Sequence, residues 1–178
     1  MNWNEVITFW FETLSPSQWF IKDPALDEEI RNRFLSTYLK VVKGETAEWR
    51  EVPEGRLAEI IVLDQFARNM FRDTPQAFEY DPLALQLAEE AIKVGADRRL
   101  TRVERKFLYM PYMHSESPVM HKKAFWLFLF LGDFSTLSFE LKHKKIIDRF
   151  GRYPHRNDIL GRTSTPKEIE FMKSNKGF

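Results

Sequence analysis

Apolar residues recur every three or four positions along much of the chain, which is the spacing of one face of an α-helix. The stretch 24–42 shows this face clearly, with apolar side chains at Leu26, Ile30, Phe34, Tyr38 and Val41. Asp23 and Pro24 are typical of a helix start, and Gly44 is typical of a helix end. No stretch alternates apolar and polar residues over enough positions to demand a strand. The pattern therefore predicts an all-α protein.

Helix boundaries are marked at several other places along the chain. Asp81 with Pro82 repeats the start signal, and Gly95 repeats the end signal. Two Thr/Glu pairs have the spacing of a capping box, which closes the first turn of a helix: Thr101 with Glu104, and Thr165 with Glu168. Helical spacing also covers four further stretches: 6–14, 53–66, 118–131 and 136–150. The sequence predicts about eight helices in a single domain, 1–178.

Composition and charge narrow the classes of function. The 178 residues carry 27 basic and 26 acidic side chains, so the net charge of +1 gives no general attraction to nucleic acid or to an anionic membrane. The absence of cysteine excludes disulfides, thiolate nucleophiles and iron–sulfur ligation. The first residues lack the basic region of a secretory signal. We expect a cytoplasmic protein with no nucleic-acid partner and no membrane association.

The longest apolar run, 124–131, is too short to cross a membrane, because a spanning helix needs about twenty apolar residues. A helix that is apolar on all sides lies either at the centre of a protein or in a subunit interface. Central burial is the more common case, and we expect it here. A homo-oligomer formed through the apolar helix 118–131 is the alternative.

Asp64 lies on a predicted apolar face, because it continues the buried stripe of helix 53–66. An ionised carboxylate in that position is costly unless a cation or an amide pairs with it. Arg68 lies four residues further on, within reach on the same helix, and Asn69 follows it. We expect Asp64 to have an internal partner.

Pro111 lies inside the helix that starts at Thr101. Proline removes one backbone donor and crowds the preceding turn, so the sequence predicts a kink or a helix end near Tyr109. Such a break would aim the residues that follow it. Among these, His114 and Glu116 carry side chains that can exchange protons or bind ions.

Two further histidines receive no chemical role. His143 shares an apolar stripe with its neighbours on helix 136–150, which is typical of a core histidine with one satisfied ring nitrogen. His121 lies beside two lysines and is expected to be exposed.

The segment 149–162, with the sequence RFGRYPHRNDILGR, concentrates polar chemistry where glycine and proline turn the backbone. Seven Lys or Arg and two Asp between positions 142 and 162 give a local charge of +5. The candidate residues are Arg152, His155, Arg156, Asn157 and Arg162. Arginine prefers planar bidentate partners such as carboxylates and phosphates. The cluster is therefore either a set of internal pairs with Asp64 and Glu116, or a binding site.

Several motifs together resemble the bacterial family catalogued as domain of unknown function 924. They are WFIKDPALDEEI at 19–30, LDQFARN at 63–69, FLYMPYMHSE at 107–116 and IIDRFGRYPHRNDILGRTSTPKEIEFM at 146–172. The resemblance implies an all-α fold like that of the tetratricopeptide-repeat superfamily, with antiparallel helix pairs stacked in a superhelix. It implies no activity. The family's motif residues fall here on Asp64, Gln65, Arg68, Asn69, His114, Ser115, Glu116, Arg152, His155, Arg156, Asn157 and Arg162.

Three hypotheses for function remain open. The first is a binding module in which the motif residues converge on a pocket for a small anionic ligand or an acidic peptide end. The second is a hydrolase or transferase with His114 or His155 as general acid or base and Glu116 or Asp64 as its orienter. The third is a protein–protein interaction scaffold. We expect no cofactor and no metal, because the sequence holds no nucleotide-binding or zinc motif and neighbouring arginines disfavour a cation.

Overall fold

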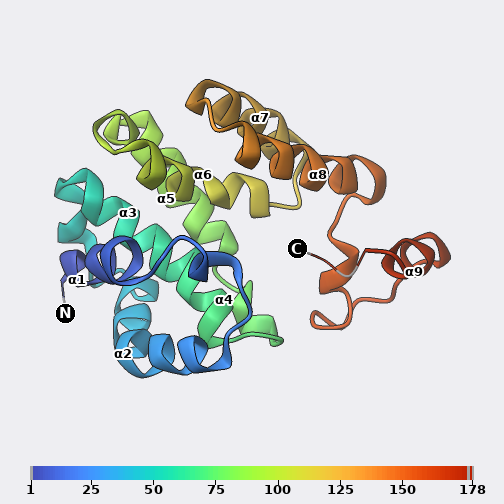
Figure 1. The fold of residues 1–178 in the computed structure, drawn as a ribbon, viewed down its shortest axis with the longest axis horizontal. Coiled ribbons are helices and arrows are strands. Elements are labelled where there is room, and N and C mark those ends of the chain that lie inside the picture. The colour runs from blue at the N-terminus through green and yellow to red at the C-terminus, as the bar shows by residue number, and fades with distance from the viewer. Residues whose placement is uncertain (1, 176, 178) are drawn as a thin grey trace. The chain divides into compact units, whose positions relative to one another are not determined.

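The computed structural model describes residues 2–175 and 177, and every regular element in this part of the chain is helical. Figure 1 shows the helices in chain order. They are α1 (Trp3–Thr8), continued by the π-helical segment η1 (Phe9–Thr13); α2 (Pro24–Val42); α3 (Pro53–Ile61), continued by the π-helical segment η4 (Val62–Phe66) and by α4 (Ala67–Met70); α5 (Asp81–Lys93); α6 (Arg102–His114); α7 (Pro118–Leu131); α8 (Phe134–Phe150); and α9 (Pro166–Met172). Short 3-10 turns lie between them at Gln18–Phe20, Ala47–Glu51, Pro75–Ala77, Ala96–Arg99 and Pro154–Arg156. With continuous segments joined, the described residues form eight helical bodies, which confirms the all-α prediction.

Most of the predicted helix ends are confirmed. The Asp23 carboxylate accepts hydrogen bonds from the first backbone N–H groups of α2, and Gly44 has a φ of 74° just after the end of that helix. Both capping boxes form, at Thr101 and at Thr165. Asp81 is the exception: Tyr80 occupies the cap position, and Asp81 is the first residue of α5. Its carboxylate bonds to an arginine instead of capping the helix.

Of the two outcomes predicted near Tyr109, the helix end is wrong, because α6 continues through Pro111 to His114, and the kink stays a prediction. Residues 107–113 are all buried. Burial of a continuous apolar stretch on this scale outweighs the local cost of a proline in a helix, which is about 3 kcal/mol. His114 is therefore the last residue of a helix that contains the proline.

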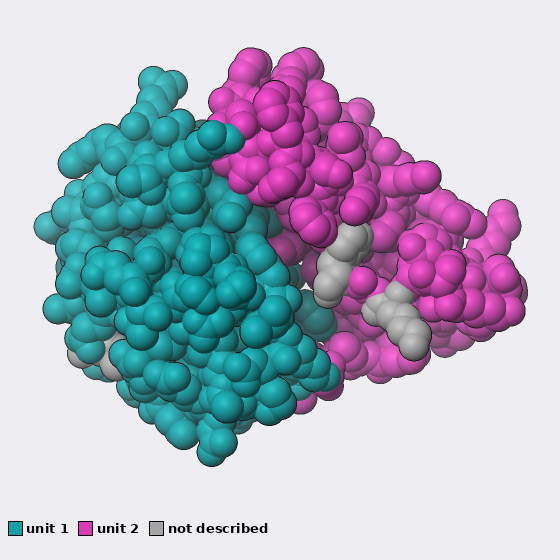
Figure 2. Space-filling model, in the orientation of Figure 1, with its two compact units in different colours: residues 1–72, 76–111 teal, residues 73–75, 112–178 magenta. Residues whose placement is uncertain are grey.

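The chain divides into two compact units, which Figure 2 colours separately. Unit 1 comprises residues 1–72 and 76–111, and unit 2 comprises residues 73–75 and 112–178. Whether the two units act as the single domain expected from the sequence stays a prediction. None of the described helices is long and apolar enough to cross a membrane.

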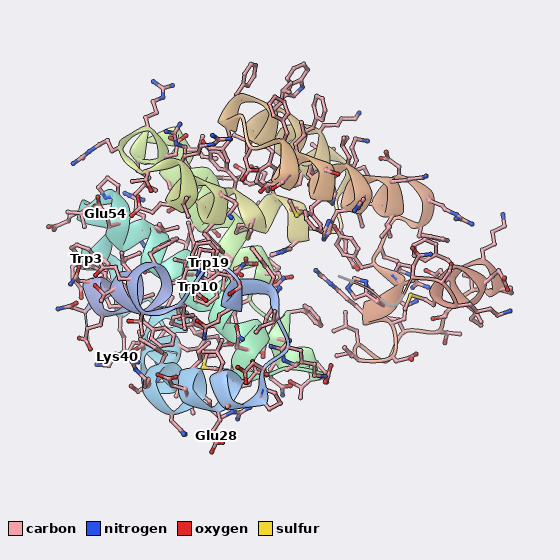
Figure 3. The ribbon with its side chains drawn as sticks, viewed as in Figure 1. Trp3, Trp10, Trp19, Glu28, Lys40 and Glu54 are labelled. Atoms are coloured by element: carbon pink, nitrogen blue, oxygen red, sulfur yellow. The ribbon has the colours of Figure 1, made fainter. Side chains whose placement is uncertain are left out.

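Aromatic side chains fill the core of unit 1, where α1 packs on α3 and α2 packs on α4. The rings of Phe34 and Phe66 lie 4.6 Å apart, and Phe9 contacts both. The rings of Trp10 and Trp19, which Figure 3 labels, stack with their centroids 6.4 Å apart. The Trp19 indole N–H donates to the Trp10 carbonyl at 2.8 Å. Aromatic contacts of this kind add to the burial of large apolar surfaces, so they stabilise the helical packing of unit 1.

Helices α7 and α8 pack side by side in unit 2 (Figure 1). Ala124 and Phe128 on α7 are fully buried, whereas Trp126 is 55% exposed and Phe130 is 81% exposed. The expectation that the run 124–131 is buried on all sides is therefore wrong. Helix α7 buries one face and leaves large aromatic side chains on the other.

A small second cluster forms at the far end of α8 in unit 2. Ile146, Ile147 and Tyr153 are its buried members, and Phe150 and Phe171 pack against them. Tyr153 is fully buried although it follows the turn at Gly151. The cluster anchors the segment 149–162 to the helix that precedes it.

Candidate functional site

The ten residues predicted to form a site are divided between the two units. Three lie in unit 1: Asp64, Arg68 and Asn69. Seven lie in unit 2: His114, Glu116, Arg152, His155, Arg156, Asn157 and Arg162. Convergence of these two groups of residues on one site stays a prediction.

Asp64 lies on the π-helical segment η4 and is 1% exposed. The Arg68 guanidinium lies 3.0 Å from an Asp64 carboxylate oxygen and 3.0 Å from an oxygen of Asp81. The side-chain amide of Gln65 also donates to Asp64. The expectation of an internal partner for Asp64 is therefore confirmed. Arg68 joins the η4 turn to the first residue of α5.

Asn69 takes part in a second tie, between α2 and the end of α4. Its amide donates to Asp27 at 2.8 Å, and Arg72 donates to the same carboxylate at 2.6 and 2.7 Å. Burial raises the pKa of Asp27, and the hydrogen bonds from Arg72 and Asn69 lower it by more, so the net pKa lies below its ordinary value. Asp27 had no predicted role, although it lies in the motif stretch 19–30.

Glu116 and Arg162 form a bidentate pair in unit 2. The guanidinium nitrogens donate to the two carboxylate oxygens at 2.6 and 3.0 Å, and the Tyr153 N–H donates to Glu116 Oε1 at 2.7 Å. Burial raises the pKa of Glu116, and these hydrogen bonds lower it by more, so the net pKa lies below its ordinary value. Both oxygens accept from internal donors, which leaves Glu116 poorly placed to orient a catalytic histidine.

Arg152 forms a second bidentate pair, with Glu168 of α9, at 2.7 and 2.8 Å. Glu168 is 2% exposed and also closes the capping box with Thr165. The Arg152 hydrogen bonds hold the pKa of Glu168 at about 2. The capping-box spacing predicted that Glu168 closes the first turn of a helix. Nothing in the sequence indicated that Glu168 also pairs with Arg152.

Asn157 is fully buried and completes this set of internal bonds. Its amide donates to the Ser164 hydroxyl at 2.9 Å, and its carbonyl oxygen accepts from Arg162 at 3.0 Å. Arg162 also donates to the Tyr153 carbonyl at 3.1 Å. Segment 149–162 was expected to hold either internal pairs or a binding site. Internal pairing explains the contacts of Arg152, Asn157 and Arg162.

Two of the other candidates of unit 2, Arg156 and His155, lie beside the buried ring of Tyr153. The Arg156 guanidinium lies 4.6 Å from the ring centroid and donates to the backbone carbonyl of His114, the third candidate, at 3.0 Å. The His155 ring lies 5.5 Å from the Tyr153 ring. Arg156 is buried, whereas His114 and His155 are half-buried. A guanidinium group held in place in this way has planar donors that suit a carboxylate or a phosphate.

His121 is fully buried, so its predicted exposure is wrong. Its ring nitrogens lie 2.9 Å from Glu140 Oε1 and 2.9 Å from the Ser115 carbonyl. The neighbouring lysines lie on the exposed side of α7, while His121 lies on the side that faces α8. The sequence context showed the lysines but not the side of the helix on which His121 lies.

His143 is a core histidine, as predicted. It is 7% exposed, and its Nδ1 lies 2.8 Å from the Phe139 carbonyl, to which it donates. Burial lowers the pKa of His143 to about 3, because the charged form loses its hydration. His143 is therefore neutral at physiological pH.

The geometry fixes the protons of the buried pair formed by His121 and Glu140. His121 Nε2 faces the Ser115 carbonyl and lies 3.1 Å from the Tyr153 hydroxyl. That hydroxyl donates to the backbone carbonyl of Met113 at 2.5 Å. Since a carbonyl only accepts, Nε2 carries a proton. A second proton must then lie between Nδ1 and Glu140 Oε1, and the pair is neutral overall. Burial raises the pKa of Glu140 despite the opposing effect of His121.

The model of a family described as "Bacterial protein of unknown function (DUF924)" matches residues 6–176. The chain belongs to the DUF924 family. A solved structure entitled "Structure of Protein of Unknown Function ATU0120 from Agrobacterium tumefaciens" is 36% identical in sequence, with a TM-score of 0.92 over 97% of each chain. None of the curated proteins matches. The resemblance seen in the sequence is thus confirmed at the level of the family.

Charge and histidine are distributed unequally in this DUF924 protein. Unit 2 carries twelve Lys or Arg and eight Asp or Glu, so its net charge is +4, and it holds all four histidines. Unit 1 carries fifteen basic and eighteen acidic residues, for a net charge of −3, and no histidine. Among the described residues, no group of three or more His, Cys, Asp or Glu side chains could hold a metal ion. Unit 2 therefore has the excess of basic side chains and all of the imidazole groups.

Proposed function

We propose that this DUF924 protein is a binding module, and that unit 2 binds a small anionic ligand through a carboxylate or phosphate group. An acidic peptide end is one source of such a carboxylate. The observation that carries the proposal is the placement of Arg156 and His155 beside the buried ring of Tyr153, with Arg156 bonded to the His114 carbonyl, in a unit of net charge +4. Guanidinium and imidazole groups supply directional donors to an anion.

The two bidentate pairs act as the frame of this site. Arg162 joins Glu116 to the backbone of Tyr153, and Arg152 joins the same segment to α9. Groups held in this way lose less conformational entropy when a ligand binds, so a rigid frame favours affinity. The superhelix of antiparallel helix pairs expected from the family resemblance belongs to the same proposal, because superhelices of this kind offer concave binding surfaces.

A thermal-shift titration tests the proposal, with inorganic phosphate, succinate and a nucleoside triphosphate as probes. We expect at least one probe to raise the melting temperature of the native protein in a concentration-dependent way. The double variant Arg156→Lys, His155→Gln should lose this shift, because Lys cannot reproduce the planar donors of Arg. The exposed Lys145→Gln removes a charge from unit 2 away from this cluster and should keep the shift, which separates the loss of planar donors from a change in net charge. Equal stabilisation of the double variant and the native protein would refute the assignment.

A further inference from the structure

Large aromatic side chains are exposed on one side of α7 and at the start of α8. Trp126 is 55% exposed, Phe130 is 81% exposed and Phe134 is 74% exposed. The rings of Trp126 and Phe130, one helical turn apart, stack at 5.8 Å. We call Trp126, Phe130 and Phe134 the aromatic face. It takes no part in the cluster around Tyr153.

The opposite side of α7 already has its partner within the chain. His121, Ala124, Phe128 and Leu131 are buried on it, and α7 packs against α8. The aromatic face therefore does not supply the packing between these two helices. Three exposed aromatic side chains close together in sequence are unusual on a monomer, where large apolar residues at the surface are normally scattered.

The aromatic face supplies most of the area that a small dimer interface needs. A Phe or Trp side chain buries about 150–250 Å² when fully covered, so the three residues at their exposed fractions present roughly 400 Å². Two copies face to face would bury about 800 Å² from these side chains alone. Val119 is 57% exposed on the same helix, and with the stems of Lys122 and Lys123 the total approaches the ~1,200 Å² of the smaller specific interfaces.

We propose that the aromatic face is a homodimer interface, in which α7 of a second copy of this chain packs antiparallel to α7 of the first. A two-fold axis between Trp126 and Phe130 places Trp126 of each copy against Phe130 of the other. Counting outward by three residues in this register brings Lys123 to the carboxyl end of α7 of the second copy, which Gly132 closes in a left-handed conformation. A cation is favoured beside the partial negative charge at the C-terminus of a helix. The register thus pairs apolar with apolar residues and places a basic residue at a helix end that attracts it.

Light scattering coupled to size exclusion measures the mass directly. We expect the purified chain to have about twice its mass of 21.3 kDa at micromolar concentration and above. Phe130→Glu should shift the protein to the single-chain mass and weaken self-association at least tenfold, because a charge at the centre of the interface would lose its hydration. Ile169→Glu places the same charge on an exposed apolar residue of α9 and should leave the dimer intact. A single-chain mass for the native protein at hundred-micromolar concentration would overturn the proposal.

The position of Lys123 supplies an independent test of the register. Lys123 is exposed, so its substitution should leave the fold unchanged. Lys123→Glu should weaken the dimer several-fold by placing a negative charge at the C-terminus of α7 of the second copy, and Lys123→Arg should retain it. Equal effects of these two variants would exclude the antiparallel register. A flotation assay with anionic vesicles checks the other occupant: binding of a monomeric native protein through the aromatic face would assign that face to membranes and overturn the dimer.

Discussion

The two units stabilise their folds by different means. Unit 1 has an aromatic core, and the carboxylates that it buries, such as Glu59 and Asp64, are each paired with an arginine. Unit 2 buries a network that contains an imidazole, in which Tyr153, His121 and Glu140 are connected, and it leaves the rings of Trp126 and Phe130 exposed. Buried polar groups cost free energy unless each is satisfied, so they specify a geometry more than they add stability. The units therefore differ most in histidine, because all four histidines lie in unit 2.

The largest expected effect is on the aromatic core of unit 1. Phe66 is fully buried and its ring contacts Phe34, Phe9 and Trp10. Phe66→Ala should lower the free energy of unfolding by about 4 kcal/mol, because it removes buried apolar area and leaves a cavity. Urea denaturation measures the loss, and hydrogen exchange locates it. Faster exchange should be confined to amides of unit 1. An equal increase in α7 and α8 would show that the aromatic core of unit 1 stabilises both units equally.

Acid should act more strongly on unit 2, because the histidines lie there. The pKa of His143 is about 3 in the folded protein and about 6.5 in the unfolded chain, so the unfolded state binds a proton more readily. Stability is therefore present above pH 6.5 and lost as the pH falls toward 3, with about 3 kcal/mol lost by pH 4. His143→Leu should remove this loss. Hydrogen exchange at pH 4 measures it, and opening of unit 1 before unit 2 would contradict the prediction.

Helix starts and ends could be predicted because the signals are local. Asp23, Thr101 and Thr165 each act on backbone groups within three residues. The same locality explains the confirmed pairing of Asp64 with Arg68, which lie one helical turn apart. Predictions failed where distant packing decides the outcome, as at Pro111, where burial keeps α6 continuous.

The candidate site was harder to predict, because most of its partners are remote in sequence. Arg162 pairs with Glu116 across 46 positions, and Arg152 pairs with Glu168 across 16. The sequence offered Glu116 as a partner for the arginine segment but gave no sign of Glu168. It also could not show which side of α7 faces α8, so the buried His121 and the exposed Phe130 were both misjudged. Composition singled out segment 149–162 as a candidate, and only the fold shows which residues pair with it.

An intermediate effect is expected for the ion pair that supports segment 149–162. Arg162→Met leaves the Glu116 carboxylate and the Asn157 carbonyl without this donor, and should cost about 2 kcal/mol. The control is Lys173→Met, which removes an ion pair with Glu170 in which the two side chains are 68% and 72% exposed. That change should cost less than about 0.5 kcal/mol. Chemical denaturation measures both values, and similar losses would mean that the pair in unit 2 is no more than a surface contact.

The smallest effects compare the two capping boxes, one in each unit. Thr101→Ala and Thr165→Ala each remove a side-chain acceptor at a helix start, which costs about 1 kcal/mol. The loss should be greater at Thr165, because Glu168 in that box also binds Arg152, and a frayed first turn of α9 would loosen this pair. Glu104 bonds to Thr101 within its own box. Denaturation of the two variants, of Arg152→Met and of the double variant Thr165→Ala, Arg152→Met measures this coupling. Strictly additive losses in the double variant would show that the cap of α9 and the frame of the candidate site are independent.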